Sequence, residues 1–295
     1  MNTKKKSQAK EKKILRIAIQ GAKGSFHELA AKKHFSEDLE CLECNSFKDV
    51  FSRVANGEAD FGITAIENTV AGTILPNYAM LRNAEARIIG EVYLHIQQNL
   101  LALPGQTIQD IQEVHSHPMA ILQCQNYFEK HPHIKLIEAD DTAASARWIS
   151  EKKLNGFGAI AGLHVAELYK MDVLATSIET HKKNFTRFLV IERSTSHAER
   201  GTEKTVPDKS SICFNVAHKK GSLASILSEL AEYDINLTKI QSLPLLGKEW
   251  EYYIHIDMEF DNYSRYQSAL KKIMPSLNEF KILGEYKRGS KIFNN

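Results

Sequence analysis

Short apolar runs alternate with helix-like stretches from about Arg16 to Arg193, which is the pattern of strands joined by helices. Strands are expected at 16–20, 40–44, 61–67, 113–115, 134–138 and 158–161. Helices are expected at about 25–35, 47–56, 119–130 and 142–152. This alternation predicts an α/β domain with mainly parallel sheets.

Two longer β-like segments, 87–103 and 173–190, interrupt the alternation. Each is long enough to pass from one sheet to another, so they predict crossovers between two lobes that enclose a cleft. In open α/β sheets, ligands bind beyond the carboxyl ends of the strands. The junctions at these strand ends are therefore the places to look for chemistry.

A polar segment at 195–209, poor in large apolar side chains, predicts a linker after a domain spanning residues 15–194. Beyond it, strands are expected at 211–216, 236–245, 249–258 and 280–286, and helices at 223–233 and 263–273. This β-α-β-β-α-β order is ferredoxin-like and predicts an α+β domain over residues 210–290. A small domain of this kind attached to an enzyme-like body suggests regulation.

Composition and charge fit a water-soluble protein that does not bind nucleic acid. Of the 295 residues, 43% are hydrophobic and 25% are charged, and no apolar run approaches the length of a membrane span. Residues 1–13 hold six lysines and one glutamate, which leaves a slightly acidic body because the whole chain carries +2. We interpret residues 1–14 as a disordered basic tail. The next apolar stretch is too short for a secretory signal, so we expect a cytoplasmic protein.

Cys41 and Cys44 form a C-x-x-C pair, which invites a metal or redox interpretation. The other cysteines, at 124 and 213, offer no second half-site. On a strand, residues three apart point to opposite faces. We therefore expect ordinary core or surface cysteines and no metal site.

Several strand-to-helix junctions carry polar side chains, at 21–28, 66–72, 114–118, 140–142 and 184–188. In the first, Ser25 and Glu28 form a capping box, and the flanking glycines would let backbone N–H groups approach an anion. Such a turn is also common for structural reasons alone. In the last, Arg187 stands at the mouth of a strand, where it is either a carboxylate clamp or an exposed strand-end charge.

Together these segments closely resemble the prephenate dehydratase family. The resemblance rests on GAKGSF (21–26), AIENTVAG (65–72), SHP (116–118) with QC (123–124), DTAASA (141–146) and NFTRF (184–188). It spans about residues 16–290 and includes an ACT regulatory domain, in GSL (221–223) and NLTKIQSLP (236–244). It implies a two-lobed catalytic domain similar to periplasmic binding proteins, followed by an ACT domain, in a homodimer or homotetramer.

The implied reaction converts prephenate to phenylpyruvate, carbon dioxide and water in phenylalanine biosynthesis, with no metal or organic cofactor. The family position of Thr186 acts on the departing hydroxyl; we interpret it as a hydrogen-bond donor, since threonine is a poor acid. Arg187 is assigned to the pyruvyl carboxylate. Gripping the ring carboxylate would stabilise the ground state more than the transition state.

The remaining site residues follow from the same resemblance. Neutral donors that orient the substrate are Asn68, Ser116 and Gln123, and the ionisable candidates for the proton source are Glu67 and His117. Residues expected to bind substrate, besides Arg187, are Phe185, Thr69, Gly24 and Ser25.

The ACT motifs depart from the family pattern, which commonly reads G-A-L and E-S-R-P. Here they read G-S-L at 221–223 and Q-S-L-P at 241–244, so a glutamate and an arginine are missing. We still expect phenylalanine to bind at an interface between ACT domains and to inhibit. The expected effector-binding residues are Gly221, Ser222, Leu223, Asn236, Gln241 and Ser242.

Two alternatives remain open. Arogenate dehydratase acts on a substrate with an amino group in place of the keto group, which one or two contacts could discriminate. A non-catalytic ACT-containing amino-acid sensor is the alternative from another class. A fused chorismate mutase domain is not expected, because only about 15 residues precede the first strand.

Overall fold

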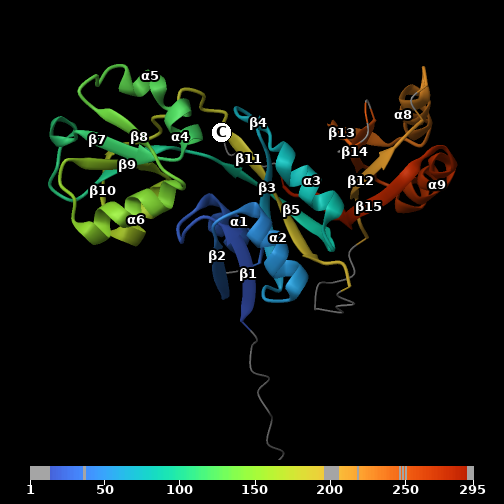
Figure 1. Ribbon diagram of the computed structural model, residues 1–295, viewed down its shortest axis with the longest axis horizontal. Coiled ribbons are helices and arrows are strands. Elements are labelled where there is room, and N and C mark those ends of the chain that lie inside the picture. Colours follow the sequence, from blue (N-terminus) through green and yellow to red (C-terminus); the bar gives the residue numbers. More distant parts are fainter. Residues whose placement is uncertain are drawn as a thin grey trace, which may run out of the picture.

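The structure is a computed structural model that describes residues 14–35, 38–195, 206–217, 219–245, 247, 249 and 251–290. Its strands form three sheets that follow one another along an elongated molecule (Figure 1). We call the bodies built on them lobe 1, lobe 2 and the C-terminal domain. Apart from residue 14, the predicted basic tail lies outside the described residues, and so does most of the predicted linker.

Lobe 1 is built on the sheet β2-β1-β3-β11-β5, with β4 paired to β3. Its strands are β1 (Leu15–Gln20), β2 (Leu39–Cys44), β3 (Phe61–Asn68), β4 (Gly72–Thr73), β5 (Ala86–His95) and β11 (Phe185–Arg193). Its helices are α1 (Phe26–His34), α2 (Phe47–Asn56) and α3 (Leu75–Asn83). Strands β1 to β3 are parallel, and β11 runs antiparallel to β3 and β5.

Lobe 2 is built on the sheet β10-β6-β9-β7-β8. Its strands are β6 (Asn99–Ala102), β7 (Glu113–Ser116), β8 (Lys135–Glu138), β9 (Phe157–Ala161) and β10 (Asp172–Ala175). Its helices are η1 (Ile108–Asp110), α4 (Pro118–Gln123), α5 (Gln125–Phe128), α6 (Thr142–Lys152) and α7 (Leu163–Tyr169). The chain enters this lobe after β5 and returns to lobe 1 in β11, so the two predicted crossover regions do join the lobes.

Local sequence signals explain most element boundaries. Helix α2 begins after Ser46, whose hydroxyl accepts from the Asp49 N–H, and ends at Gly57, which adopts the left-handed conformation. The single β segment predicted at 87–103 is instead two strands in different sheets, and the helix predicted at 119–130 is broken at Cys124. The prediction missed α3 and α7, which are short and have weak sequence signals.

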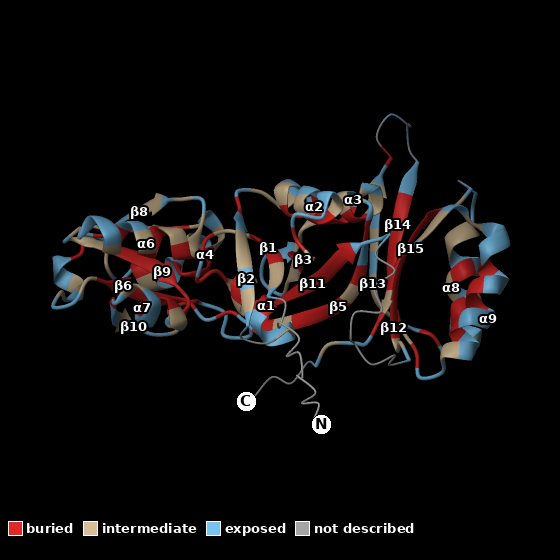
Figure 2. Cartoon of the chain, turned by 90° about the horizontal axis from the view of Figure 1, so that it is seen from below, coloured by how far each residue is buried: buried red, intermediate tan, exposed pale blue. Residues whose placement is uncertain are grey.

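The C-terminal domain has the β-α-β-β-α-β order expected from the sequence, with the antiparallel sheet β13-β14-β12-β15. Its elements are β12 (Lys209–Asn215), α8 (Ser222–Glu232), β13 (Asn236–Pro244), β14 (Tyr252–Glu259), α9 (Tyr263–Ile273), η2 (Met274–Ser276) and β15 (Asn278–Tyr286). Strand β12 begins inside the predicted linker. Helices α8 and α9 cover the sheet face that points away from lobe 1 (Figure 2).

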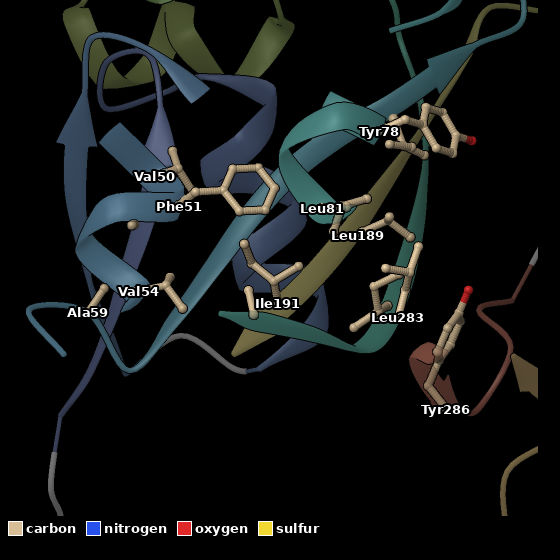
Figure 3. Packing of buried hydrophobic residues seen from close by; sticks show 14 of the residues in the cluster. Val50, Phe51, Val54, Ala59, Tyr78, Leu81, Leu189, Ile191, Leu283 and Tyr286 are labelled. Atoms are coloured by element: carbon tan, nitrogen blue, oxygen red, sulfur yellow. The ribbon is translucent and has the colours of Figure 1, made fainter. Parts of the chain in front are cut away.

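The other face of this sheet packs on lobe 1. Leu283 and Tyr286 of β15 belong to the same buried cluster as Val50 and Leu189 of lobe 1 (Figure 3). Lys281 donates to the last carbonyls around the end of α3, at 2.8 Å and 3.0 Å. The C-terminal domain therefore completes the core of lobe 1. Within the described residues, no helix combines the length and apolar character needed to cross a membrane.

Candidate active site

The orientation of the Asn68 amide is fixed by its neighbours. Its Oδ1 accepts from the backbone N–H groups of Val70 and Ala71, at 2.8 Å and 2.7 Å. Because those groups can only donate, the amide NH₂ must face the other way. There it donates to Asn184 Oδ1 at 2.7 Å and to Thr186 Oγ1 at 2.9 Å.

This orientation decides where the Thr186 hydroxyl points its hydrogen. Its oxygen accepts from Asn68, so its own hydrogen is directed elsewhere, and the described residues offer it no hydrogen-bond acceptor. The side chain is 8% exposed. Thr186 therefore has a free O–H donor at a position that is almost fully buried.

The same chain of amides continues across to lobe 2. Asn184 donates from Nδ2 to Gln123 Oε1 at 2.9 Å, at the end of α4. Gln98 donates to the same oxygen at 3.4 Å. With its oxygen occupied, Gln123 has its NH₂ group left to donate, and no acceptor for it is found in the described part of the chain. Thr186, Asn68 and Gln123 are thus the predicted site residues that the structure brings together.

Ser116 is the last residue of β7 in lobe 2, and His117 follows it. Ser116 is fully buried, and its hydroxyl donates to the Ile160 carbonyl at 2.7 Å, so its predicted role as a donor to substrate is contradicted. His117 Nδ1 accepts from the Met119 N–H at 3.2 Å and caps α4. A neutral His117 consequently carries its proton on Nε2.

Asp141 of lobe 2 links the two lobes, because it contacts the glycine-containing loop at residues 21–24 of lobe 1. It caps α6 by accepting from the Ala144 N–H at 2.8 Å, and it also accepts from the Ala22 backbone of lobe 1. Burial raises the pKa of its carboxyl, while these hydrogen bonds and the nearby His117 oppose the rise. A side chain at Gly21 would meet this carboxylate, since a Cβ there would lie 2.5 Å from Asp141 Oδ2.

The predicted anion cradle at Gly24 and Ser25 is occupied by the protein itself. The Gly24 N–H donates to Glu28 Oε2 at 2.5 Å, and its carbonyl accepts from His164 at 2.8 Å. Ser25 is 2% exposed and caps α1 by accepting from the Glu28 N–H. Glu28 thus reaches Gly24 rather than completing the predicted capping box. This loop links the two lobes, and both backbone groups of Gly24 are taken by the protein, which leaves no N–H there for an anion, contrary to the prediction.

Arg187 does not face the cleft, so the predicted carboxylate clamp is wrong. Its side chain is buried in a charge cluster between lobe 1 and the C-terminal domain. Its guanidinium donates to Glu91 at 2.7 Å, Asp257 at 2.5 Å, Glu67 at 3.4 Å and Tyr286 at 3.1 Å. Burial would lower the pKa of Arg187, but Asp257, Tyr286 and Glu91 raise it well above its usual value.

Glu67 belongs to the same cluster, which contradicts its predicted role as a proton source. Its carboxylate also pairs with Lys239 of β13 at 2.7 Å. Asp257 is buried, which disfavours its charge, yet the adjacent Arg187 holds the pKa of Asp257 below its usual value. Arg187 and Asp257 therefore face each other as a charged pair at neutral pH.

Thr69 and Phe185 fix the loop beside the site. The Thr69 hydroxyl donates to the Lys183 carbonyl and accepts from the Phe185 N–H, both at 2.9 Å, so its hydrogen is not free to donate to substrate. The Phe185 ring stacks on His95 with 4.7 Å between ring centres. An open hollow of about 510 Å³ lies here, lined by Thr69, Val70, Thr180, His181, Lys182 and Lys183.

The predicted effector residues are divided between two places in the C-terminal domain. Ser222 and Leu223 line a hollow of about 180 Å³, together with residues that include Asn215 and Tyr252. Gly221 precedes α8 in the left-handed conformation. The other three lie on β13, where Gln241 donates to the Ser242 carbonyl. One chain alone does not gather the six residues around one hollow.

A family model for prephenate dehydratase matches residues 17–196, which is more than half of the chain. The chain belongs to this family. A bifunctional chorismate mutase/prephenate dehydratase from Aquifex aeolicus is 34% identical over 278 residues, covering 94% of this chain and 74% of that protein. Arogenate dehydratase 2 from Petunia hybrida is 35% identical over 301 residues, covering 96% and 74%.

A solved structure gives the same result for the fold. The prephenate dehydratase from Arthrobacter aurescens, in complex with L-Phe, superimposes with a TM-score of 0.81 at 28% identity, covering 93% of this chain and 90% of that chain. The family resemblance inferred from the motifs is therefore confirmed, and the prephenate dehydratase fold spans nearly the whole chain.

Sequence reasoning missed Asn184, which lies inside the NFTRF motif but was given no role. It is fully buried and links the Asn68 amide to Gln123. A signal was available, since an asparagine next to a catalytic candidate and before an apolar strand is a costly residue to bury. Asp257 and Lys239 carried no comparable signal.

Proposed function

We propose that this chain is a prephenate dehydratase that converts prephenate to phenylpyruvate, carbon dioxide and water. The observation that carries the proposal is the directed chain of amides through Asn68 and Asn184, which leaves the Thr186 O–H and the Gln123 NH₂ as donors. A dehydratase needs a hydrogen-bond donor to the hydroxyl that departs from its substrate. A preorganised donor that is shielded from water stabilises the charge developing on that oxygen effectively.

The reaction consumes one proton. The ring C–O bond breaks and the hydroxyl leaves as water, while the bond to the ring carboxylate breaks and its electron pair enters the ring, which becomes aromatic. In our proposal Thr186 polarises the departing oxygen and Gln123 orients the substrate. His117 remains the candidate proton source, because Glu67 is taken up by the charge cluster.

With Arg187 buried elsewhere, another cation must attract the substrate's carboxylates. Lys183 is exposed, lines the hollow beside Thr69, and immediately precedes Asn184. The described residues give its ammonium group no ion-pair partner. We propose that Lys183 supplies this positive charge.

Replacing Lys183 by glutamine should raise KM for prephenate about fivefold with little change in kcat, because an exposed ion pair contributes up to about 1 kcal/mol. Added salt should reduce the difference in KM between the wild type and Lys183→Gln. Steady-state kinetics at two ionic strengths measure both effects. Lys271→Gln, on α9 of the C-terminal domain, is the matched control. An unchanged KM in Lys183→Gln would contradict the assignment.

We propose further that the C-terminal domain is an ACT domain and that phenylalanine inhibits through it. Support comes from its β-α-β-β-α-β order and from the relative from Arthrobacter aurescens, whose structure contains L-Phe. Since the expected effector residues are divided within one chain, binding at an interface in a homodimer or homotetramer is part of the proposal. So are a two-lobed catalytic domain similar to periplasmic binding proteins and a cytoplasmic location.

The test is turnover by the purified chain with prephenate and with arogenate, with and without phenylalanine. Formation of phenylpyruvate from prephenate, lowered by phenylalanine, is the expected result. Preferred turnover of arogenate would support the arogenate dehydratase alternative, to which the Petunia hybrida relative belongs by name. Binding of phenylalanine without turnover of either substrate would indicate a sensor.

A further inference from the structure

The two strands that carry the candidate active site also carry the charge cluster. Thr186 of β11 lies directly opposite Asn68 of β3, and the next pair along the ladder is Arg187 opposite Glu67. Successive side chains of a strand point to opposite faces. Thr186 and Asn68 therefore face the cleft, while Arg187 and Glu67, one peptide unit away, face the C-terminal domain.

The C-terminal domain holds both of these neighbours directly. Asp257 of β14 and Tyr286 of β15 bind the Arg187 guanidinium, at 2.5 Å and 3.1 Å. Lys239 of β13 binds Glu67 at 2.7 Å. Three strands of one domain thus contact the two residues next to the active-site pair.

The contacts of Arg187 with Asp257 and Tyr286 are buried and interlocked. Asp257 also accepts from the Ser211 hydroxyl at 2.5 Å, and Ser211 shares a 2.8 Å hydrogen bond with Tyr286. A planar guanidinium with several fixed partners has little freedom to turn. The pairing between β11 and β3 also shifts register between Arg187 and Phe188. Regular strand pairing on the Phe188 side therefore does less to fix the position of Arg187.

We propose that Arg187 and Glu67 are positioning residues through which the C-terminal domain sets the spacing of Thr186 and Asn68. The inference rests on the proposed function of the site, and it gives the C-terminal domain a part in basal turnover. A shift of β14 or β13 moves Arg187 or Glu67, and the rigid peptide units carry the shift to the hydrogen bond between Asn68 and Thr186.

The test compares Asp257→Asn with Lys281→Met. Asp257→Asn removes the charge by which the C-terminal domain holds Arg187, while Glu91 and Glu67 of lobe 1 stay in place. Lys281→Met breaks a link of the same domain interface that leads to the end of α3. We expect kcat to fall at least tenfold in Asp257→Asn, with KM for prephenate within about twofold. We expect Lys281→Met to keep its kcat within about twofold of the wild type.

A second readout needs no substrate, which keeps the inference separable from the proposed function. Amide hydrogen exchange over residues 184–188 should be faster in Asp257→Asn than in the wild type and unchanged in Lys281→Met. If the wild type does not turn over prephenate, the proposed function fails while this readout still decides the coupling. Unchanged exchange in a folded Asp257→Asn, or equal losses in both variants, would overturn the inference.

Discussion

Replacing Thr186 by valine is expected to lower kcat for prephenate about 10²- to 10³-fold, the usual loss when one preorganised donor to a developing charge is removed. Valine has nearly the shape of threonine, so the packing at this buried position is kept. The hydroxyl is the group that the Asn68 amide leaves free to donate. Steady-state formation of phenylpyruvate measures the loss.

Two companion variants distinguish the effect of having a hydroxyl at residue 186 from the effect of the direction in which it donates its hydrogen. Thr186→Ser keeps a hydroxyl and should retain most of kcat. Asn68→Asp changes the group facing Thr186 from a donor to an acceptor, so the hydroxyl would turn its hydrogen toward residue 68 and away from the substrate. An active Asn68→Asp enzyme, or a Thr186→Val enzyme within tenfold of the wild type, would exclude this mechanism.

Replacing Gly284 by alanine is expected to displace the C-terminal domain from lobe 1. A Cβ at this position of β15 would lie 2.2 Å from the Ile88 carbonyl oxygen and 2.7 Å from the Ile88 Cβ. The obstacle is the backbone of β5, which cannot rotate away as a side chain can. Overpacking of this kind costs about 1–3 kcal/mol or more. We expect Tm to fall by about 2–5 °C or more in differential scanning calorimetry.

The reference for this variant is Gly105→Ala. Gly105 adopts φ +83° with open space around it, so alanine there adds only local backbone strain, worth about 1 kcal/mol. A Gly284→Ala protein that melts no lower than Gly105→Ala would mean that β15 does not depend on close contact with β5.

Much of this molecule could be predicted from local patterns. Helices α6 and α9 begin and end at the residues that the sequence indicated, because helical periodicity and capping residues such as Asp141 and Asn262 lie close together there. The β-α-β-β-α-β order of the C-terminal domain could equally be predicted from the sequence. Helix α7 was missed because seven residues after a glycine carry little periodicity.

The error at Arg187 has a different origin. The alternation of a strand already says that Thr186 and Arg187 point to opposite faces, yet both were assigned to the cleft because they share one motif. No local sequence pattern reveals which residue Arg187 binds. Asp257 lies 70 residues further along the chain, and its position follows from how two domains pack.

The buried cluster that joins Val50 and Leu189 to Leu283 and Tyr286 has a consequence for biosynthesis. A ribosome makes the chain from its N-terminus, so the core of lobe 1 stays incomplete until β15 has emerged. Until then the face of β5 that receives Gly284 is open to water and to other nascent chains. A chain truncated before residue 278 would lose more than the last strand of its C-terminal domain. It would leave lobe 1 with an exposed apolar face, and such products are expected to aggregate or to be degraded.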